Sequence, residues 1–286
     1  MPKEIKLVEC PRDAMQGIVN FIPTNLKAQY INLLLKVGFD TIDFGSFVSA
    51  KAIPQMKDTA ELVKKLDLSD TETKLLAIVA NYKGAENACE FEEIKYLGFP
   101  FSVSEIFQQR NTNSTREEAL NNVDEIQNLC IKHDKKLMVY LSMGFGNPYN
   151  EPFNLSILTE WTDKLVANGV QILALSDTIG VSNPQNIKEI YPFLTKNYPK
   201  IEWGMHLHST PDKSFEKIEA AFKNGCTRFD AAMKGYGGCP MAKEELTGNV
   251  ATENVLTYLE QNQFQTNINK EAFIEALKFS EQIFTS

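Results

Sequence analysis

The stretch QILALSDTIGVSNPQNIKEIYPFLTKNYPKIEWGMHLH (171–208) holds one complete strand–helix–strand unit. Its two ends, QILALS (171–176) and EWGMHLH (202–208), are short, mostly apolar runs typical of buried strands. Between them, segment 184–197 places apolar residues at helical spacing. This stretch therefore predicts two strands joined by a helix.

The same alternation runs through the whole chain. Strands are predicted at 5–10, 41–45, 75–80, 94–99, 137–142, 171–176, 202–208 and 227–232. Helices are predicted at 25–38, 115–134, 154–168, 184–197, 211–224 and 250–262, with an additional C-terminal helix at 269–284. Eight strands alternating with helices indicate a (β/α)8 TIM barrel. No linker-like tract divides the chain, so we expect a single catalytic domain over residues 1–286. The alternative, a doubly wound open sheet, is disfavoured because no GxGxxG motif follows the first strand.

Composition excludes several classes of partner. The net charge is −8 and no dense basic run is present, which argues against nucleic-acid binding. No apolar run approaches membrane-spanning length. The five cysteines are odd in number and widely spaced, which favours reduced thiols. The first strand starts almost at once, so we expect no targeting segment and a cytoplasmic protein.

In such a barrel, reactive side chains lie at the carboxyl ends of the strands and in the loops that follow. Arg12 and Asp13 follow the first strand directly, where an Arg can stabilise an oxyanion and an Asp can bind a hard cation. A solvated turn is the alternative for this pair. Asp43, inside an otherwise apolar strand, pairs with Arg12, acts in proton transfer, or serves only as a helix cap or structural ion pair.

Two further strands carry candidate residues at their ends. His206 and His208 are separated by one residue, so their side chains point to the same side of a strand and can converge on one metal ion. Asp177 and Thr178 follow the sixth strand, where they orient a substrate or a ligand side chain. For Asp177 the alternative is a role in ordering its own loop.

The segment after the eighth strand is rich in glycine and carries Cys239. A loop of this kind can bring its backbone close to a ligand, and a thiol there can act as acid, base or nucleophile. A small buried apolar cysteine is the alternative. Asn249 offers a carbonyl oxygen to a metal, or else caps the next helix. Asp, Asn and two His form a mixed nitrogen–oxygen set that suits Mg²⁺ or Mn²⁺ better than a structural zinc.

Several motifs resemble those of 3-hydroxy-3-methylglutaryl-CoA (HMG-CoA) lyases, members of the DRE-TIM metallolyase superfamily. They are ECPRDAMQ (9–16), FGSFVSAKAIPQM (44–56), LSDTIGV (175–181), MHLHST (205–210) and GYGGCPMAKEELTGNVATEN (235–254). The resemblance covers residues from about 5 to 262. It implies a divalent-metal-dependent lyase that cleaves HMG-CoA to acetyl-CoA and acetoacetate, as in leucine catabolism.

The resemblance also implies a role for each matching position. The metal ligands it implies are Asp13, His206, His208 and Asn249. Arg12 resembles the arginine that stabilises the enolate, Cys239 resembles the catalytic thiol, and Asp43 falls where the family has a Glu. The base is His206 or Asp43. Gln16 and Asp177 match positions near the substrate, and segment 103–115 resembles a loop that helps to hold CoA.

Some positions depart from the family pattern. After Gln16 the chain reads GIVNF, with Ile18 and Val19 in a segment where the family has a lysine that grips CoA. Ser209 replaces the acid that usually follows the second histidine. The partner is expected to be a small acyl-CoA, and a homodimer is the assembly considered. The rival functions are a related Claisen condensation or aldol cleavage on another acyl-CoA or 2-oxo acid, and a catalytically lapsed barrel that binds a metabolite.

Overall fold

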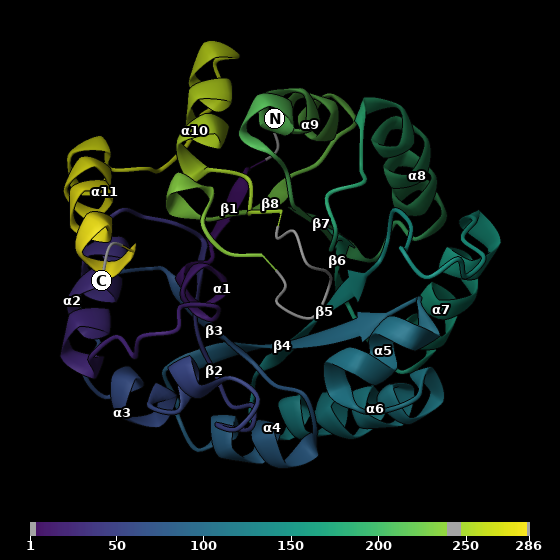
Figure 1. Cartoon of the computed structure of the whole chain (residues 1–286), viewed down its shortest axis with the longest axis horizontal. Helices are drawn as coiled ribbons and strands as arrows, with labels where there is room; N and C mark the ends of the chain where they lie inside the picture. Colours follow the sequence, from purple (N-terminus) through teal and green to yellow (C-terminus); the bar gives the residue numbers. More distant parts are fainter. Residues whose placement is uncertain (1–3, 239–246, 285–286) are drawn as a thin grey trace.

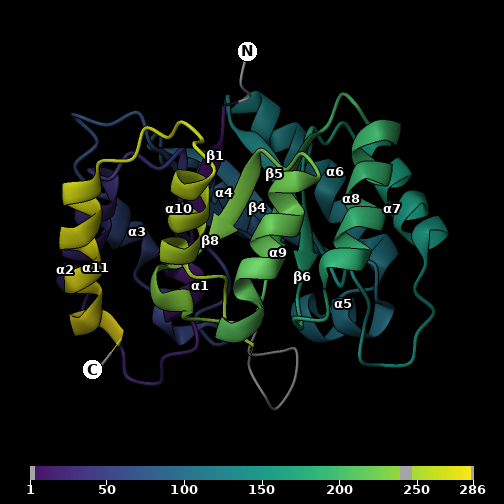
Figure 2. The same ribbon diagram turned by 90° about the horizontal axis from the view of Figure 1, so that it is seen from above.

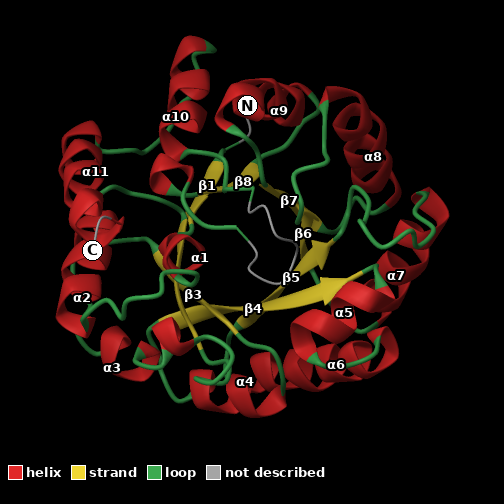
Figure 3. Ribbon diagram, in the orientation of Figure 1, coloured by secondary structure: helices red, strands yellow, loops and turns green. Residues whose placement is uncertain are grey.

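Eight parallel strands form a closed barrel in the computed structural model, which describes residues 4–238 and 247–284 (Figures 1 and 3). Each strand pairs with the next one along the chain, and β8 returns to pair with β1. The strands are β1 (Lys6–Glu9), β2 (Thr41–Ser46), β3 (Lys74–Ile78), β4 (Ile94–Ser102), β5 (Lys136–Ser142), β6 (Ile172–Asp177), β7 (Glu202–Leu207) and β8 (Arg228–Ala231). The predicted TIM barrel is confirmed.

A ring of helices surrounds the barrel (Figure 3). Its main members are α2 (Thr24–Leu35), α3 (Thr59–Val63), α4 (Tyr82–Cys89), α6 (Arg116–Lys132), α7 (Leu155–Ala167), α8 (Pro184–Asn197), α9 (Pro211–Lys223) and α10 (Thr252–Gln261). Helix α8 has the predicted bounds, and local residues fix where it begins. Asn183 accepts hydrogen bonds from the backbone of Gln185 and Asn186, and Pro184 occupies the first turn.

Several short elements were not predicted from the sequence. They are the helices α3, α4, α1 (Pro11–Met15) and α5 (Glu105–Thr112), and the 3₁₀ turns η1 (Pro54–Met56) and η2 (Met233–Gly235). Each is about two helical turns long or less, which is too short for a clear periodic apolar pattern. Helices α1 and α5 follow the carboxyl ends of β1 and β4, so they shape that end of the barrel.

The additional C-terminal helix is present as α11 (Lys270–Phe284) and lies beside α2 (Figures 1 and 2). The ring of Tyr30 on α2 stacks on Phe279 at 6.4 Å and meets Phe284 edge-on at 6.2 Å. Such contacts add to the apolar area that the helix buries. Across residues 4–238 and 247–284, no helix is long and apolar enough to cross a membrane.

Candidate metal centre and catalytic site

The two histidines of segment 204–212 converge at the carboxyl end of β7. His206 lies in β7, and His208 lies one residue past its end. Their Nε2 atoms face each other at 3.2 Å. The Nδ1 atom of His206 meets Asp230 Oδ2 at 3.2 Å, and that of His208 meets the Thr178 carbonyl oxygen at 3.1 Å. A carbonyl oxygen can only accept, so His208 carries its hydrogen on Nδ1 and turns the lone pair of Nε2 toward His206.

Asp13 and Asn249 complete the set of potential ligands. One carboxylate oxygen of Asp13 and one ring nitrogen of each histidine lie within 4.8 Å of one another. The amide nitrogen of Asn249 donates to Asp13 Oδ2 at 2.6 Å and to the Tyr236 carbonyl oxygen at 2.9 Å. The amide oxygen of Asn249 accepts no hydrogen bond from the described part of the chain and is available as a ligand. Asn249 does not cap α10, whose N-cap is Ala251.

The electrostatics of this cluster favour a bound cation. Burial alone would raise the pKa of Asp13, but Arg12 and the two histidines outweigh it and lower that pKa to about 2. Burial, followed by the charge of His206, lowers the pKa of His208 to about 4. Burial also lowers the pKa of His206, yet Asp230 outweighs it and the pKa lies above its ordinary value. The two facing Nε2 atoms therefore share either one proton or one metal ion, beside an ionised carboxylate.

Arg12 occupies the centre of a buried charge network. Its Nε and Nη2 donate to Asp43 at 2.5–3.2 Å, and its Nη1 donates to Asp13 at 3.0 Å and to Gln16 at 2.9 Å. Burial is the main reason that the pKa of Asp43 rises to about 6, although Arg12 acts against it. Of the five N–H groups of a guanidinium, one on Nη2 has no acceptor among the described residues. Arg12 and Asp43 are thus paired, as the sequence suggests, and one donor remains for a ligand.

Asp177 is buried behind the histidines and does not line the cavity at this end of the barrel. Its Oδ1 accepts from Val181 N at 2.8 Å, and its Oδ2 accepts from Ser182 N at 2.9 Å. The same Oδ2 receives Lys217 Nζ at 3.0 Å. These contacts favour the loop-ordering alternative for Asp177. The loop that it orders carries Thr178, the partner of His208.

A cavity of about 440 Å³ opens over this end of the barrel. Its charged side chains are Arg12, Asp13 and Arg110, and both His206 and His208 border it. Gln16, Tyr140, Phe107 and Asn111 are further members of its lining. Among the described residues of the lining, the cations outnumber the one carboxylate, which suits an anionic ligand in a chain that is acidic overall.

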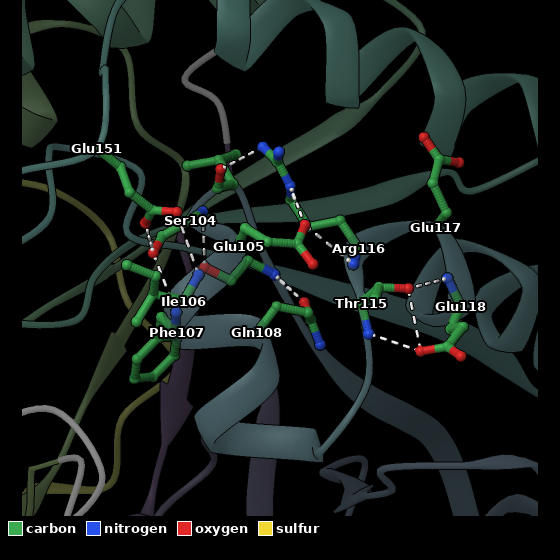
Figure 4. Close-up of polar contacts among 12 residues, drawn as sticks. Ser104, Glu105, Ile106, Phe107, Gln108, Thr115, Arg116, Glu117, Glu118 and Glu151 are labelled. Carbon is green, nitrogen blue, oxygen red and sulfur yellow. Dashed lines mark hydrogen bonds and ion pairs between the residues drawn. The ribbon is translucent and has the colours of Figure 1, made fainter. Parts of the chain in front are cut away.

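The α5 wall of this cavity is tied firmly to its surroundings (Figure 4). The hydroxyl of Ser104 caps α5 by accepting from Phe107 N at 3.1 Å, and it donates to Glu151. Arg116 Nε donates to Glu105 Oε2 at 2.7 Å. These contacts fix α5, and with it Arg110, at the mouth of the cavity.

At Gly237 the glycine-rich segment comes close to Asp13 and Asn249, two of the potential metal ligands. This glycine has φ +99°, and a Cβ atom there would lie 2.7 Å from both Asn249 Nδ2 and the Asp13 carbonyl oxygen. Only glycine fits such a position. Cys239, the predicted thiol, lies outside the described residues.

Two groups in the site were not predicted from the sequence. Asp230, on β8, holds His206, and its Oδ1 is buried without a hydrogen-bond partner among the described residues. An acid inside the otherwise apolar run TRFDAA is the signal that singled out Asp43, and it could have singled out Asp230 as well. Tyr140, on β5, contacts His206 edge-on at 5.5 Å, and its buried hydroxyl has no described partner. A tyrosine in an apolar strand carries no comparable signal.

Fold and site together define a TIM barrel that gathers a mixed nitrogen–oxygen set of potential metal ligands at the carboxyl ends of its strands. The family model described as HMGL-like matches residues 5–279, so the chain belongs to the HMGL-like family. Among its curated relatives, hydroxymethylglutaryl-CoA lyase YngG of Bacillus subtilis is 32% identical over 98% of this chain and 93% of its own length.

Solved structures of similar proteins superpose over nearly the whole chain. The HMG-CoA lyase of Bacillus subtilis gives a TM-score of 0.91 at 31% identity and covers 98% of this chain and 94% of its own. An HMG-CoA lyase of Acinetobacter baumannii, solved with coenzyme A and 3-methylmalate, gives 0.90 at 27% identity and covers 98% and 91%.

Proposed function

We propose that this protein cleaves HMG-CoA to acetyl-CoA and acetoacetate with the help of a divalent metal ion, Mg²⁺ or Mn²⁺. The observation that carries the proposal is the convergence of the two histidine Nε2 atoms, 3.2 Å apart, with the Asp13 carboxylate. Membership of the HMGL-like family and the similarity to HMG-CoA lyases support it.

The donor set fits a divalent cation. Two neutral nitrogen lone pairs that face each other repel unless a positive charge lies between them, and Asp13 supplies a negative charge beside them. We assign Asp13, His206, His208 and Asn249 as ligands. The bound ion would act as a Lewis acid on the substrate's tertiary hydroxyl and lower the pKa of that hydroxyl.

Side chains of the protein stabilise the negative charge of the enolate and transfer the protons of the reaction. Arg12 borders the cavity with one N–H group left over, so it can donate to the enolate oxygen that forms when the C–C bond breaks. Cys239 is the proposed proton donor to that enolate. Asp43 is fully buried and both its oxygens accept hydrogen bonds from Arg12, so it orients Arg12. The identity of the base, His206 or Asp43, stays a prediction.

The mouth of the cavity suits the CoA portion of the substrate. Arg110 is held there by α5 and lies over the Tyr149 ring, 4.8 Å from its centroid, with no carboxylate partner among the described residues. It therefore offers a positive charge to phosphate groups. In the predicted CoA-gripping segment, Val19 is almost fully exposed and carries no charge. The contribution of Arg110 is correspondingly more important.

An assay for acetoacetate tests the proposal. The purified protein is incubated with HMG-CoA and Mg²⁺ or Mn²⁺, and acetoacetate is measured with and without a chelator. We expect product that disappears with chelator and returns when metal is added back. In Cys239→Ala, metal binding should persist while most turnover is lost.

Two other results would favour a different function for this protein. No acetoacetate, together with condensation of acetyl-CoA and a 2-oxo acid, would indicate the related synthase chemistry. No heat of binding when divalent metal is titrated into the protein would indicate a lapsed barrel.

We further propose a cytoplasmic location. The cysteines that the structure describes are free thiols buried in the fold, as in a reducing compartment: Cys10, Cys89, Cys130 and Cys226. The homodimer stays a prediction, which the molecular mass in solution would test.

A further inference from the structure

Lys217 is a fully buried lysine on α9, the helix that lies outside β7 and next to α8 (Figure 1). Its ammonium group donates to three acceptors: the His208 carbonyl oxygen at 2.8 Å, Asp177 Oδ2 at 3.0 Å and the Gly180 carbonyl oxygen at 3.1 Å. An ammonium has three N–H donors, so all are used. Burying this charge is costly, and the three acceptors lie on two segments that meet at the metal site.

The first segment is the loop after β6. Asp177 pairs with Lys217 and also accepts the backbone N–H groups of Val181 and Ser182, which folds the loop back on itself. This loop places the Thr178 carbonyl oxygen 3.1 Å from His208 Nδ1. The tautomer and ring orientation of His208 therefore depend on the loop that Lys217 ties down.

The second segment is the end of β7 itself. Lys217 binds the backbone of His208 directly, just beyond the end of the strand. Next to it, the Ser209 hydroxyl donates to the Thr210 carbonyl oxygen and to no other described residue, so it gives the His208 ring no support there. The Ser209 backbone N–H donates to the Gly248 carbonyl oxygen at 2.9 Å, beside the ligand Asn249. A shift of His208 would therefore also move the segment that carries Asn249.

We propose that Lys217 is a positioning residue of the metal centre. From outside the cavity, its ammonium holds both the backbone of His208 and the loop that orients the His208 ring. It thereby keeps Nε2 of His208 aimed at Nε2 of His206 and at Asp13. This inference rests on the proposed function, because it assumes that these residues hold a metal ion.

Metal binding tests this role directly. Lys217→Met keeps most of the side-chain volume and removes the charge and the donors. Calorimetric titration with Mn²⁺ should show an affinity about 10- to 100-fold weaker than in the unmodified protein, the range seen when residues behind a metal ligand are changed. Any loss of turnover should be partly reversed by raising the Mn²⁺ concentration, because Lys217 does not line the cavity and acts through metal affinity.

Lys27 provides a matched control. It is also a fully buried lysine, and it is paired with Asp58 Oδ1 at 2.8 Å and with the Gln55 carbonyl oxygen, away from the metal ligands. Lys27→Met should lose thermal stability as Lys217→Met does, but bind Mn²⁺ with unchanged affinity. A structural role alone would make the two variants behave alike.

The outcomes separate cleanly. If Lys217→Met binds Mn²⁺ as tightly as the unmodified protein, or if Lys27→Met weakens binding equally, the positioning role is wrong. If Lys217→Met does not fold, Lys217→Gln, which keeps donors for the carbonyl oxygens, replaces it: weaker Mn²⁺ binding supports the role, and unchanged binding contradicts it. Lys217→Arg, which keeps the charge, should recover much of the affinity. If the unmodified protein itself binds no Mn²⁺, the proposed function fails first, and the inference fails with it.

Discussion

The barrel buries an arginine at each end, Arg228 at the amino ends of the strands and Arg12 at the carboxyl ends. Arg228 contacts Glu202 Oε1 at 3.1 Å and Asp40 Oδ2 at 3.5 Å, and its guanidinium lies over the Tyr96 ring, 5.4 Å from the centroid. Within the described residues, only its Nε lacks a partner. Its acceptors belong to segments far apart in sequence, so this arginine ties the barrel closed.

Arg12 is buried almost as completely, but its surroundings retain unused hydrogen-bonding capacity. The same cavity is bordered by Arg12, Tyr140, His206 and His208. Among the described residues, one Arg12 N–H group and the Tyr140 hydroxyl lack partners, and the Nε2 atoms of the two histidines have only each other. Buried polar groups are normally satisfied, and exceptions concentrate where a ligand completes them. Single buried polar atoms without a partner occur elsewhere in the described residues, such as Nε of Arg228. The difference teaches that the functional end is marked by several such groups around one cavity, whereas buried charge occurs at both ends.

The sharpest way to break this comparison is Arg228→Met. Removing one partner of a buried charge pair typically costs 3–5 kcal/mol, and we expect about 3 kcal/mol here because Lys6 and Lys74 still accompany Glu202 and Asp40. Urea unfolding should show this loss of free energy of unfolding. Turnover of the folded enzyme should be preserved. A variant of normal stability with reduced turnover would show that the amino end also serves catalysis.

Arg12→Met is the counterpart at the other end. Loss of a group that donates to a developing oxyanion typically lowers kcat by about 10²–10³-fold. The free energy of unfolding should change much less than in Arg228→Met. The reason is that Asp43, whose pKa is about 6 even beside Arg12, can take up a proton once the cation is gone. Steady-state kinetics with HMG-CoA and urea unfolding measure the two quantities. Normal kcat in this variant would contradict the assignment of Arg12.

Patterns that repeat over many residues predicted the fold well. The run of eight strands and the capped start of α8 come from periodicity and local chemistry, which act within a few residues. The residues at the strand ends could be predicted for the same reason. The alternation of strands and helices predicts the barrel, and the barrel places residues at the carboxyl ends of its strands around one site.

What the sequence could not supply is the pairing between distant residues. Lys217 looks like one of many surface lysines, yet its helical position next to Ile218 places it on the buried face of α9. Only the three-dimensional structure shows that Asp177 lies opposite it. Asp230 stands out as an acid in an apolar strand, but its partner His206 lies 24 residues away, so the sequence does not show what it contacts.

Glu9, the last residue of β1, gives the most specific test, with a small effect at each step in pH. It is a buried acid at the functional end that accepts hydrogen bonds from Met233 N at 2.8 Å and Thr252 Oγ1 at 2.6 Å, with no cation in contact among the described residues. Burial is the largest cause that raises its pKa from 4.5 to about 8. The folded protein therefore keeps a proton on Glu9 that the unfolded chain releases above pH 4.5.

The sign of the effect follows from this proton. The stability that Glu9 contributes is fully present below pH 4.5 and is lost as the pH rises toward about 8. Glu9→Gln mimics the protonated acid and does not titrate. The difference in free energy of unfolding between Glu9→Gln and the unmodified protein should therefore grow by about 1.4 kcal/mol for each pH unit in this window, in favour of the variant. Urea unfolding at several pH values measures that difference and cancels the titration of groups that both proteins share. A constant difference would show that Glu9 is ionised in the fold, which would place an uncompensated charge at the functional end and weaken the contrast with Arg228.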